Sequence, residues 1–467
     1  MEKPELVAAV DHLESQLIDL ATTIWESPEI AMNETNASGL LASVLAEEGF
    51  DVERGIGGLP TAFQASYGTH GPIIGLLGEY DALPGLSQAA VPERSPMNRG
   101  DPGHGCGHNL HGVGAVGGAM AVKRFLESTD IPGTIRFYGC PAEETLVGKV
   151  YMARAGVFAD LDAALAWHPA DVSSVRLGTA NALDSITYRF HGESTHAAST
   201  PESGRSALDA VQLMNTGIEY MREHIPDDAR IHYVITDGGN APNVVPGTAA
   251  SSVFIRSPTR DAVDRMTAWV DDIAAGAAQM SQTRLDRDLQ TACHSYLPNE
   301  TLGMQVWENM EHIGEIPYTD EDRAFANALT STVAAEDLEA RIARYPPSLR
   351  ETLREHALYP TPVEPFDRDH HSAGTADLGD ACWNAPTVQF RGAAWPVGTP
   401  AHTWQAVAAS GALGRRAVSF AAKVFAGTIF DLLNDPDTID TALDEHRHRT
   451  GNRTYQCAVP ADVSPPN

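Results

Sequence analysis

The amino-acid sequence predicts an α/β protein in which a split domain, with a mixed sheet flanked by helices, carries an inserted ferredoxin-like α+β domain. Two observations support this prediction. Short apolar stretches alternate with helical patterns at both ends of the chain, as they do in α/β domains. Between these ends the order of elements becomes β-α-β-β-α-β, the order of a ferredoxin-like sandwich. We therefore expect a split domain formed by residues 1–182 and 297–467 around an insert of residues 183–296.

The first segment is expected to begin with two helices. Apolar residues from Leu6 to Ile24 recur at helical spacing, and a second helical pattern runs from Thr35 to Glu48. The elements that follow are expected as strands at 61–66, 72–78, 134–139 and 163–167 and helices at 108–126 and 148–155. The segment 83–107 is rich in Gly, Pro and Arg without periodicity, which predicts a long loop that is functional or disordered.

The insert and the last segment complete the pattern. The insert is expected to hold strands at 184–191, 230–236, 247–257 and 283–293 and helices at 205–224 and 260–280. A helical stretch and a loop rich in Pro and Asp, 345–375, come next. A strand at 387–391 and one helix from Thr403 to about Phe425 then return to α/β character.

Composition excludes several classes of function. Asp and Glu total 62 against 32 Lys and Arg, so the net charge of −30 repels nucleic acid and anionic membrane surfaces. There is no stretch of 18 apolar residues, and the acidic, amphipathic N-terminus does not resemble a signal peptide, so we expect no membrane association. The five cysteines are odd in number and form no CxxC pair, which predicts a reduced, cytoplasmic protein.

The densest group of candidate ligands is the segment GHGCGHNLHG at 103–112. Cys106 and His108 stand two positions apart in a glycine-rich bend before a helix, where a thiolate and an imidazole can reach one metal ion. The alternative is a buried cysteine beside a histidine that caps the helix. His104 and His111 lie nearby and are weaker candidates.

Three further polar groups lie at strand ends or before a helix. PAEE at 141–144 places two carboxylates after a strand, where one can bind metal while its unligated neighbour takes a proton from water. His168 ends the next strand, and His402 lies in a Gly/Pro loop before a helix. Alone, each group has an ordinary explanation as a surface acid pair, a core histidine or a loop residue.

Together these residues indicate a metal site. The candidate ligands all lie at strand ends or helix starts of the same split domain, and the insert contains none of them. They are Cys106, His108, Glu144, His168 and His402. That distribution is expected of a site assembled on the rim of one sheet. Thiolate and imidazole favour zinc, whereas carboxylates and open positions suit manganese, so both metals are candidates.

Six motifs occur in a characteristic order: GEYDALPGLSQ (78–88), GHGCGHN (103–109), PAEE (141–144), His168-Pro169, HGESTHAA (191–198) and GTPAHTWQ (398–405). In this order they resemble the aminoacylase/carboxypeptidase family of dinuclear metallopeptidases. Within the family they are most similar to the amidohydrolase branch, which includes hippurate and auxin-conjugate hydrolases. The resemblance covers roughly residues 10–425.

The resemblance implies two divalent metal ions, zinc or manganese, with Cys106 as the ligand shared between them. It implies that His108 and His168 complete one metal site. It also implies that Glu144 and His402 complete the other.

Three acidic residues take further implied roles. Glu143 matches the general base of the family, and Asp81 matches the residue that orients a ligand histidine. Glu79 stands where many family members have another ligand histidine. The resemblance therefore implies that this ligand is lost here and that His108 replaces it.

The insert is implied to act as a lid and dimerisation domain of a homodimer or higher oligomer. His196 resembles a histidine that reaches the active site of the neighbouring subunit. Asn243 and Arg256 match positions that bind the carboxylate of the substrate. The alternatives are a monomer with His196 on an exposed turn, and a surface role for Arg256.

The implied function is metal-dependent hydrolysis of the amide bond of an N-acyl amino acid, with an N-aroyl amino acid such as p-aminobenzoyl-glutamate favoured. Related alternatives are a dipeptidase, a hippurate- or auxin-conjugate-type hydrolase and an aromatic aminohydrolase. An alternative of another class is a subunit that acts only in a heteromer with a related A-type subunit. The complete ligand set and the retained Glu143 argue against an inactive subunit.

Overall fold

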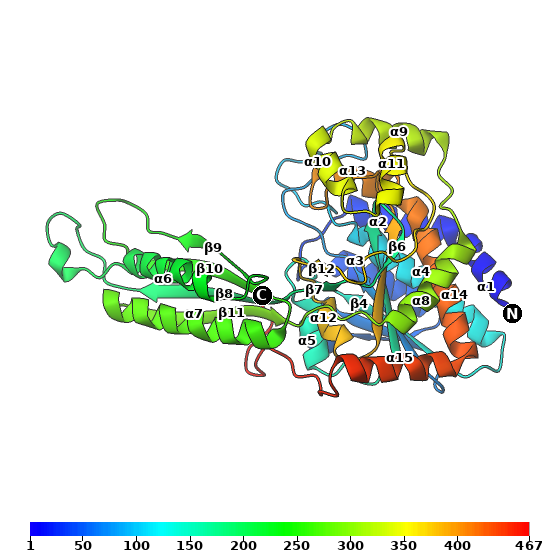
Figure 1. The fold of residues 1–467 in the computed structure, drawn as a ribbon, viewed down its shortest axis with the longest axis horizontal. Coiled ribbons are helices and arrows are strands. Elements are labelled where there is room, and N and C mark those ends of the chain that lie inside the picture. The colour runs from blue at the N-terminus through cyan, green and yellow to red at the C-terminus, as the bar shows by residue number, and fades with distance from the viewer. Residues whose placement is uncertain (467) are drawn as a thin grey trace. The chain divides into compact units, whose positions relative to one another are not determined.

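The structure is a computed structural model, and it describes residues 1–466 (Figure 1). The chain forms two compact units. The first consists of Met1–Gly178, Leu297–His370 and Ala381–Tyr455, and the second of Thr179–Tyr296, His371–Asp380 and the residues from Gln456 onward. The sequence predicts that 371–380 and the C-terminal residues belong to the split domain, whereas in the structure these segments group with the second unit.

Long-range pairing explains why these segments join the second unit. Strand β12 (His371–Ser372) pairs in parallel with β7 (Thr179–Ala180). The backbone N–H of His294 donates to Asp380 Oδ2 at 3.0 Å, and His294 Nε2 lies 2.9 Å from the Gln456 carbonyl. These partners lie far apart in the sequence, so no local periodicity could indicate them.

A seven-stranded mixed sheet forms the centre of the first unit. Its order is β1 (Asp51–Arg54), β2 (Phe63–Tyr67), β4 (Thr134–Cys140), β3 (Ile73–Glu79), β5 (Ala163–Ala170), β13 (Thr387–Ala393) and β6 (Ser174–Arg176). Strands β4, β3, β5 and β13 are parallel, and the outer strands pair antiparallel. The parallel strands are almost continuously buried, which explains their apolar runs. Their carboxyl ends therefore lie at one edge of the sheet.

Helices flank this sheet and confirm the predicted fold class (Figure 1). Helix α4 (His108–Glu127) packs on β3, β4 and β5, and α14 (Arg415–Asn434) packs on α4. Glycines in α4 allow the close approach, since a Cβ on Gly118 would lie 2.6 Å from the Cβ of Phe425. The other helices outside the ferredoxin-like sandwich are α1 (Lys3–Ala9), α2 (Glu14–Glu26), α3 (Thr35–Glu47), α5 (Gly148–Arg154), α8 (Glu300–Ile313), α9 (Asp320–Thr330), α10 (Ala335–Ile342), α11 (Pro347–Glu355), α12 (Leu378–Cys382), α13 (Trp404–Ala412) and α15 (Pro436–Arg449).

The structure corrects one expected helix. The sequence predicts a single helix from Thr403 to about Phe425, and the structure contains two, α13 and α14, with a turn between them. At the turn the backbone packs tightly against α4, since a Cβ on Gly414 would lie 2.3 Å from a methyl carbon of Leu110. The residues around the turn are apolar because they are buried there, so the apolar pattern continues across the break.

Helix α14 is long and apolar enough to cross a membrane, since its most apolar 18-residue window has a mean hydropathy of 1.3. In the structure 78% of that window is buried. The helix packs against α1, α2, α4 and α8 within the first unit. Burial in the core therefore accounts for its apolar composition.

The second unit contains the predicted ferredoxin-like sandwich. Its elements are β8 (Ala182–His191), α6 (Ala207–Met221), β9 (Arg230–Asp237), β10 (Thr248–Ser257), α7 (Arg260–Ser281) and β11 (Arg284–Cys293). The strands are antiparallel in the order β11-β8-β10-β9, and both helices pack on this sheet. Strand β9 is therefore an edge strand.

Candidate metal centre

The predicted ligands of the first unit lie around the carboxyl ends of its parallel strands. Cys106 stands in the loop before α4, and His108 is the first residue of that helix. Gly107 has a left-handed φ of 78°, and a Cβ at this position would lie 2.9 Å from the ring of Pro169. Glycine therefore lets the loop approach the end of β5, where His168 lies.

Two groups of potential metal ligands share Cys106. One comprises Cys106, His108 and His168, the other comprises Cys106, Glu144 and His402, and the ligand atoms of each group lie within 4.8 Å of one another. Cys106 Sγ lies 3.4 Å from His168 Nε2, and His402 Nε2 lies 3.3 Å from Glu144 Oε2. The structure therefore brings all five predicted ligands together in two groups around one thiol.

Neighbouring groups turn buried His108 and half-buried His168 toward this cluster. His108 Nδ1 lies 2.8 Å from Asp81 Oδ1, and His168 Nδ1 lies 2.7 Å from the Pro169 carbonyl. These contacts leave Nε2 of each ring to face the other ligands. The backbone N–H of Glu144 donates to Asp81 Oδ2 at 2.8 Å. Asp81 therefore positions one ligand of each group.

Burial shifts the pKa values of three members of the cluster. It raises the pKa of Cys106 to about 12 and lowers the pKa of His168 to about 4. Burial also raises the pKa of Glu144. A proton must therefore leave the thiol when a metal binds to Cys106, so metal affinity rises with pH.

The cluster fits divalent metal ions. His108 Nε2 and Glu144 Oε1 are buried and have no hydrogen-bond partner among residues 1–466. Buried polar atoms are almost always satisfied, so unsatisfied atoms that face one thiol indicate a ligand. Thiolate, imidazole and carboxylate are the donors that zinc and related divalent ions accept in proteins.

Glu79 forms a second buried network beside the cluster. Lys149 Nζ donates to Glu79 Oε1 at 2.7 Å, and Glu79 Oε2 lies 3.2 Å from His108 Nε2 and 3.5 Å from His111 Nε2. Burial alone would raise the pKa of Glu79, but the charges of His111 and Lys149 outweigh it and hold that pKa well below its ordinary value. Glu79, His108 and Glu143 also lie close enough together to hold a metal ion. The expectation that Glu79 merely marks a lost ligand is therefore incomplete, because its carboxylate lies within reach of the cluster.

A family model described as peptidase family M20/M25/M40 matches residues 75–433, which is more than half of the chain. The chain belongs to this family. It is 39% identical to the B-type subunit of p-aminobenzoyl-glutamate hydrolase from Escherichia coli (strain K12), over 98% of this chain and 97% of the relative. It is 30% identical to the Xaa-Arg dipeptidase of Mus musculus, over 69% of this chain and 74% of the relative.

A solved structure gives the same fold. The crystal structure of a dinuclear metal binding peptidase of the M20 family from Bacillus subtilis matches with a TM-score of 0.58 and 18% identity, over 91% of this chain and 99% of that chain. The predicted family is therefore confirmed. As a member of the M20 family, the protein is a hydrolase of amide bonds with a site for divalent metal ions.

In this M20 peptidase a buried carboxylate holds the turn that carries Glu143 and Glu144. Ala142 has a left-handed φ of 54°, a conformation that costs on the order of 1–3 kcal/mol. Its N–H donates to Glu34 Oε1 at 2.8 Å, and Thr61 Oγ1 donates to Glu34 Oε2 at 2.9 Å. Burial raises the pKa of Glu34 to about 7. Glu34 therefore stabilises the strained turn that directs the two carboxylates.

The sequence patterns do not predict a role for Glu34 or Lys149. Lys149 could have been noticed because it stands among apolar residues of α5 in a chain with only four lysines, which indicates a buried charge. Glu34 carries no comparable signal, because the groups that it binds, at residues 61 and 142, are distant in the sequence.

The three candidate residues of the second unit lie in two places. His196 is exposed, and its Nδ1 accepts two hydrogen bonds of 3.2 Å from backbone N–H groups just after it, so Nε2 is the donor side of the neutral ring. The Asn243 carbonyl accepts a hydrogen bond of 3.0 Å from the residue after His196. Arg256 lies near the end of β10 and is half-buried. The structure therefore brings His196 and Asn243 together and leaves Arg256 at a separate position.

Proposed function

We propose that this M20 peptidase hydrolyses the amide bond of an N-acyl amino acid, and that an N-aroyl amino acid such as p-aminobenzoyl-glutamate is its substrate. The observation that supports this best is the cluster in which Cys106 belongs to both ligand groups while Glu143 lies beside it. The Escherichia coli relative, which is named for p-aminobenzoyl-glutamate, matches the chain over nearly its whole length and supports the substrate.

Glu143 is positioned to move the proton. A bound pair of divalent ions would supply Lewis acidity toward the amide carbonyl and would acidify water. Glu143 Oε2 lies 3.9 Å from His108 Nε2, and 14% of its side chain is exposed, so its carboxylate can meet both water and substrate. Glu143 takes a proton from the attacking water and delivers it to the amine nitrogen as the C–N bond breaks. Glu144 is committed to the ligand group with His402 instead.

The metals that we propose are zinc or manganese. The thiol and the imidazoles favour zinc, and the glutamate carboxylates suit manganese. Elemental analysis of the purified protein, followed by reconstitution of the metal-free protein with each ion, discriminates between them.

We propose a homodimer or higher oligomer in which His196 and Asn243 act on a neighbouring subunit. Arg256 lies eight positions along β10 from the strand end next to these residues, which is about 26 Å at about 3.3 Å per residue. A small substrate cannot contact both ends of one strand, so the two groups can serve one substrate only from different chains. The edge strand β9 exposes Val234 and Ile235, which offer a surface for pairing.

Substitution of the two adjacent glutamates tests the proposed chemistry. Glu143→Gln should keep the metals and the fold but lose about three decades of turnover, since positioned proton transfer contributes about 10²–10⁴. Glu144→Gln should instead lose metal. Hydrolysis of p-aminobenzoyl-glutamate and metal content are measured together. Near-normal turnover in Glu143→Gln would place the base elsewhere, with Glu79 the next candidate.

Mixing inactive subunits tests the shared site. A mixed dimer of Glu143→Gln and His196→Ala chains carries one site with both groups intact, so part of the activity should return. Mass spectrometry verifies that subunits exchange. If they exchange and no activity appears, His196 does not act across an interface.

A heteromer with a related A-type subunit is the second candidate, because the Escherichia coli relative is named as one subunit of its enzyme. The chain expressed alone should hydrolyse N-aroyl amino acids, whereas a requirement for a second protein would favour the heteromer. Dipeptides belong in the same substrate screen, since the mouse relative is named a dipeptidase. We also propose a cytoplasmic location, on the basis of five cysteines that form no disulfide.

A further inference from the structure

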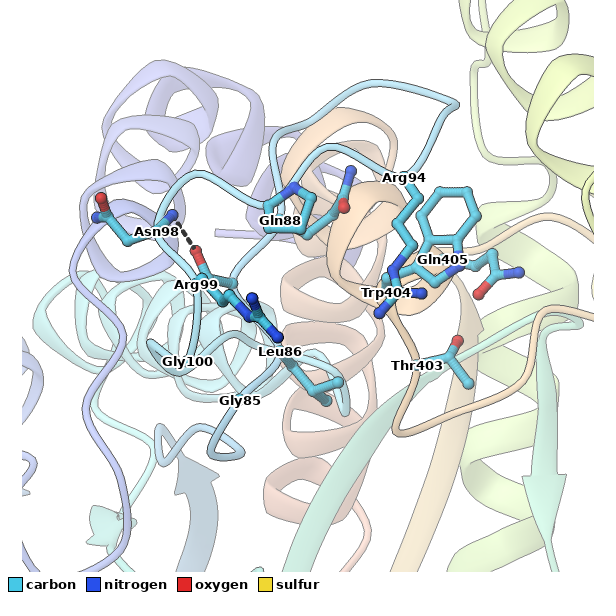
Figure 2. A pocket seen from close by; sticks show the side chains of 12 residues that line it. Gly85, Leu86, Gln88, Arg94, Asn98, Arg99, Gly100, Thr403, Trp404 and Gln405 are labelled. Carbon is cyan, nitrogen blue, oxygen red and sulfur yellow. Dashed lines mark hydrogen bonds between the residues drawn. The ribbon is translucent and has the colours of Figure 1, made fainter.

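A pocket of about 520 Å³ lies in the first unit between the loop 85–100 and the start of α13. Figure 2 shows the two walls: the loop contributes Leu86, Arg94 and Arg99, and the segment after His402 contributes Trp404. The pocket therefore combines two guanidinium groups with a half-buried indole ring.

The charge of the pocket is unusual for this chain. Acidic residues outnumber basic ones by 62 to 32, yet no Asp or Glu lines the pocket. Arg94 and Arg99 form no ion pair with any residue from 1 to 466. Two uncompensated cations in one concave site attract an anion, and the fork of a guanidinium group matches a carboxylate.

Fixed backbone holds both arginines in place. The side chain of Gln88 is buried, and its amide donates to the carbonyls of Ala89 and Glu93 and accepts from the N–H of Ser95. Arg94 stands between two of these anchored residues. The loop is therefore cross-linked by hydrogen bonds around Arg94 instead of moving freely.

A second contact fixes the part of the loop that carries Arg99. The Asn98 N–H donates to Ser87 Oγ at 3.1 Å. The Ser87 N–H in turn donates to the carbonyl of Asp101 at 2.9 Å, so residues on both sides of Arg99 are tied to the start of the loop.

The pocket adjoins the metal ligands. A Cβ on Gly105 would lie 2.7 Å from Cδ1 of Leu86, a residue that lines the pocket, and 3.4 Å from the Cα of His402. The His402 N–H donates to the Gly105 carbonyl at 2.8 Å, and Cys106 follows directly in the chain. The loop that carries Cys106 therefore packs against one wall of the pocket, and Thr403 and Trp404 of the other wall follow His402 directly in the chain.

We infer that this pocket binds a carboxylate of the substrate and selects acidic N-acyl amino acids over neutral ones. The inference rests on the proposed function and adds to it the acidic side chain of the amino acid as the group that is recognised. Arg94 and Arg99 hold the carboxylate, and Trp404 supplies an apolar surface for the adjoining part of the ligand.

The experiment compares N-(4-aminobenzoyl)-L-glutamate with its glutamine analogue, which differs only in the side-chain carboxylate. We expect Arg94→Gln/Arg99→Gln to lower kcat/KM for the glutamate compound about ten- to hundredfold, and to change the glutamine compound less than about threefold. Arg124→Gln is the matched control, because Arg124 lies sixteen residues along α4 from His108 and does not line the pocket. Equal losses for both compounds, or no loss for either, would overturn the inference.

Calorimetry separates this result from a failure of the proposed function. The binding of both compounds is measured in Glu143→Gln and in the same variant with both arginines replaced. If the enzyme hydrolyses neither compound, the proposed function fails, while a dissociation constant that rises only for the glutamate compound still supports the pocket. If hydrolysis proceeds and the two compounds bind and react equally well, the pocket inference fails and the proposed function stands. Absence of binding for both compounds also overturns the pocket inference.

Discussion

Removal of the buried lysine beside the metal cluster should destabilise the first unit strongly. The side chain of Lys149 is fully buried, that of Glu79 is 4% exposed, and their charged atoms lie 2.7 Å apart. Lys149→Met leaves the carboxylate buried without this partner, and breaking such a pair costs about 3–5 kcal/mol. His108 and His111 remain beside Glu79, so we expect a loss near about 3 kcal/mol, the lower end of that range.

Urea unfolding of the metal-free protein measures this loss. Six of the seven tryptophans lie in the first unit and only Trp269 lies in the second, so tryptophan fluorescence chiefly reports unfolding of the unit that contains Lys149. Lys423→Met is the matched control, because Lys423 pairs with Asp11 at the surface, where an ion pair contributes about 0–1 kcal/mol.

A double-mutant cycle then isolates the pair. Glu79→Gln alone removes the carboxylate that pairs with buried Lys149, and the double variant Lys149→Met/Glu79→Gln removes both charges. The double variant should therefore be less destabilised than the sum of the two single changes, by roughly 2 kcal/mol. If Lys149→Met lies within about 1 kcal/mol of the wild type, or if the single changes simply add, the buried pair does not hold this region together.

Three further predictions follow from the site. Cys106→Ala should lower metal content, and loading of the wild type should fall as pH drops, because the Cys106 thiol must lose its proton to bind metal; Cys382→Ala is the control, and full metal content in Cys106→Ala would refute the assignment. Burial raises the pKa of Glu34 to about 7, above its ordinary 4.5, so the protonated form favours the fold and the free energy of unfolding should fall as pH rises from about 4.5 to 7. Urea unfolding at pH 5 and pH 8 should show this fall reduced by about 2.5 kcal/mol in Glu34→Gln, and the same pH dependence in Glu34→Gln as in the wild type would contradict the prediction. Arg256→Ala should weaken substrates with a free α-carboxylate by about 1.5–3 kcal/mol, and equal losses for a carboxamide analogue would argue against a carboxylate contact.

The ligand cluster could be predicted because its residues mark the ends of recognisable elements. Glu144 follows an apolar strand, His168 lies near the end of another, and Cys106 and His108 stand at a glycine bend where a helix begins. Parallel strands bring such ends to one edge of a sheet, so residues that follow different strands in the sequence are expected to lie close together.

Features that depend on long-range packing could not be predicted in this way. The break between α13 and α14 arises from the close approach of Gly414 to α4, which leaves no mark in the apolar periodicity. The ion pair of Lys149 with Glu79 joins two elements whose register is set by tertiary contacts. The arginine pocket belongs to the loop predicted at 83–107, where the sequence has no periodic pattern to interpret.

The order of strands in the main sheet has a consequence for biosynthesis. Strand β5 pairs with β13, which the ribosome makes only after the whole ferredoxin-like sandwich. The sandwich is nearly continuous in the chain and can fold as soon as it has been synthesised. The edge of β5 and the glycine-rich face of α4 stay uncovered until β13 and α14 have been made. An unfinished chain therefore exposes an open strand edge and apolar helix surface, both of which favour aggregation. Any chain that stops before His402 lacks part of the second ligand group, so a nascent chain completes the ligand cluster only after His402 has been made.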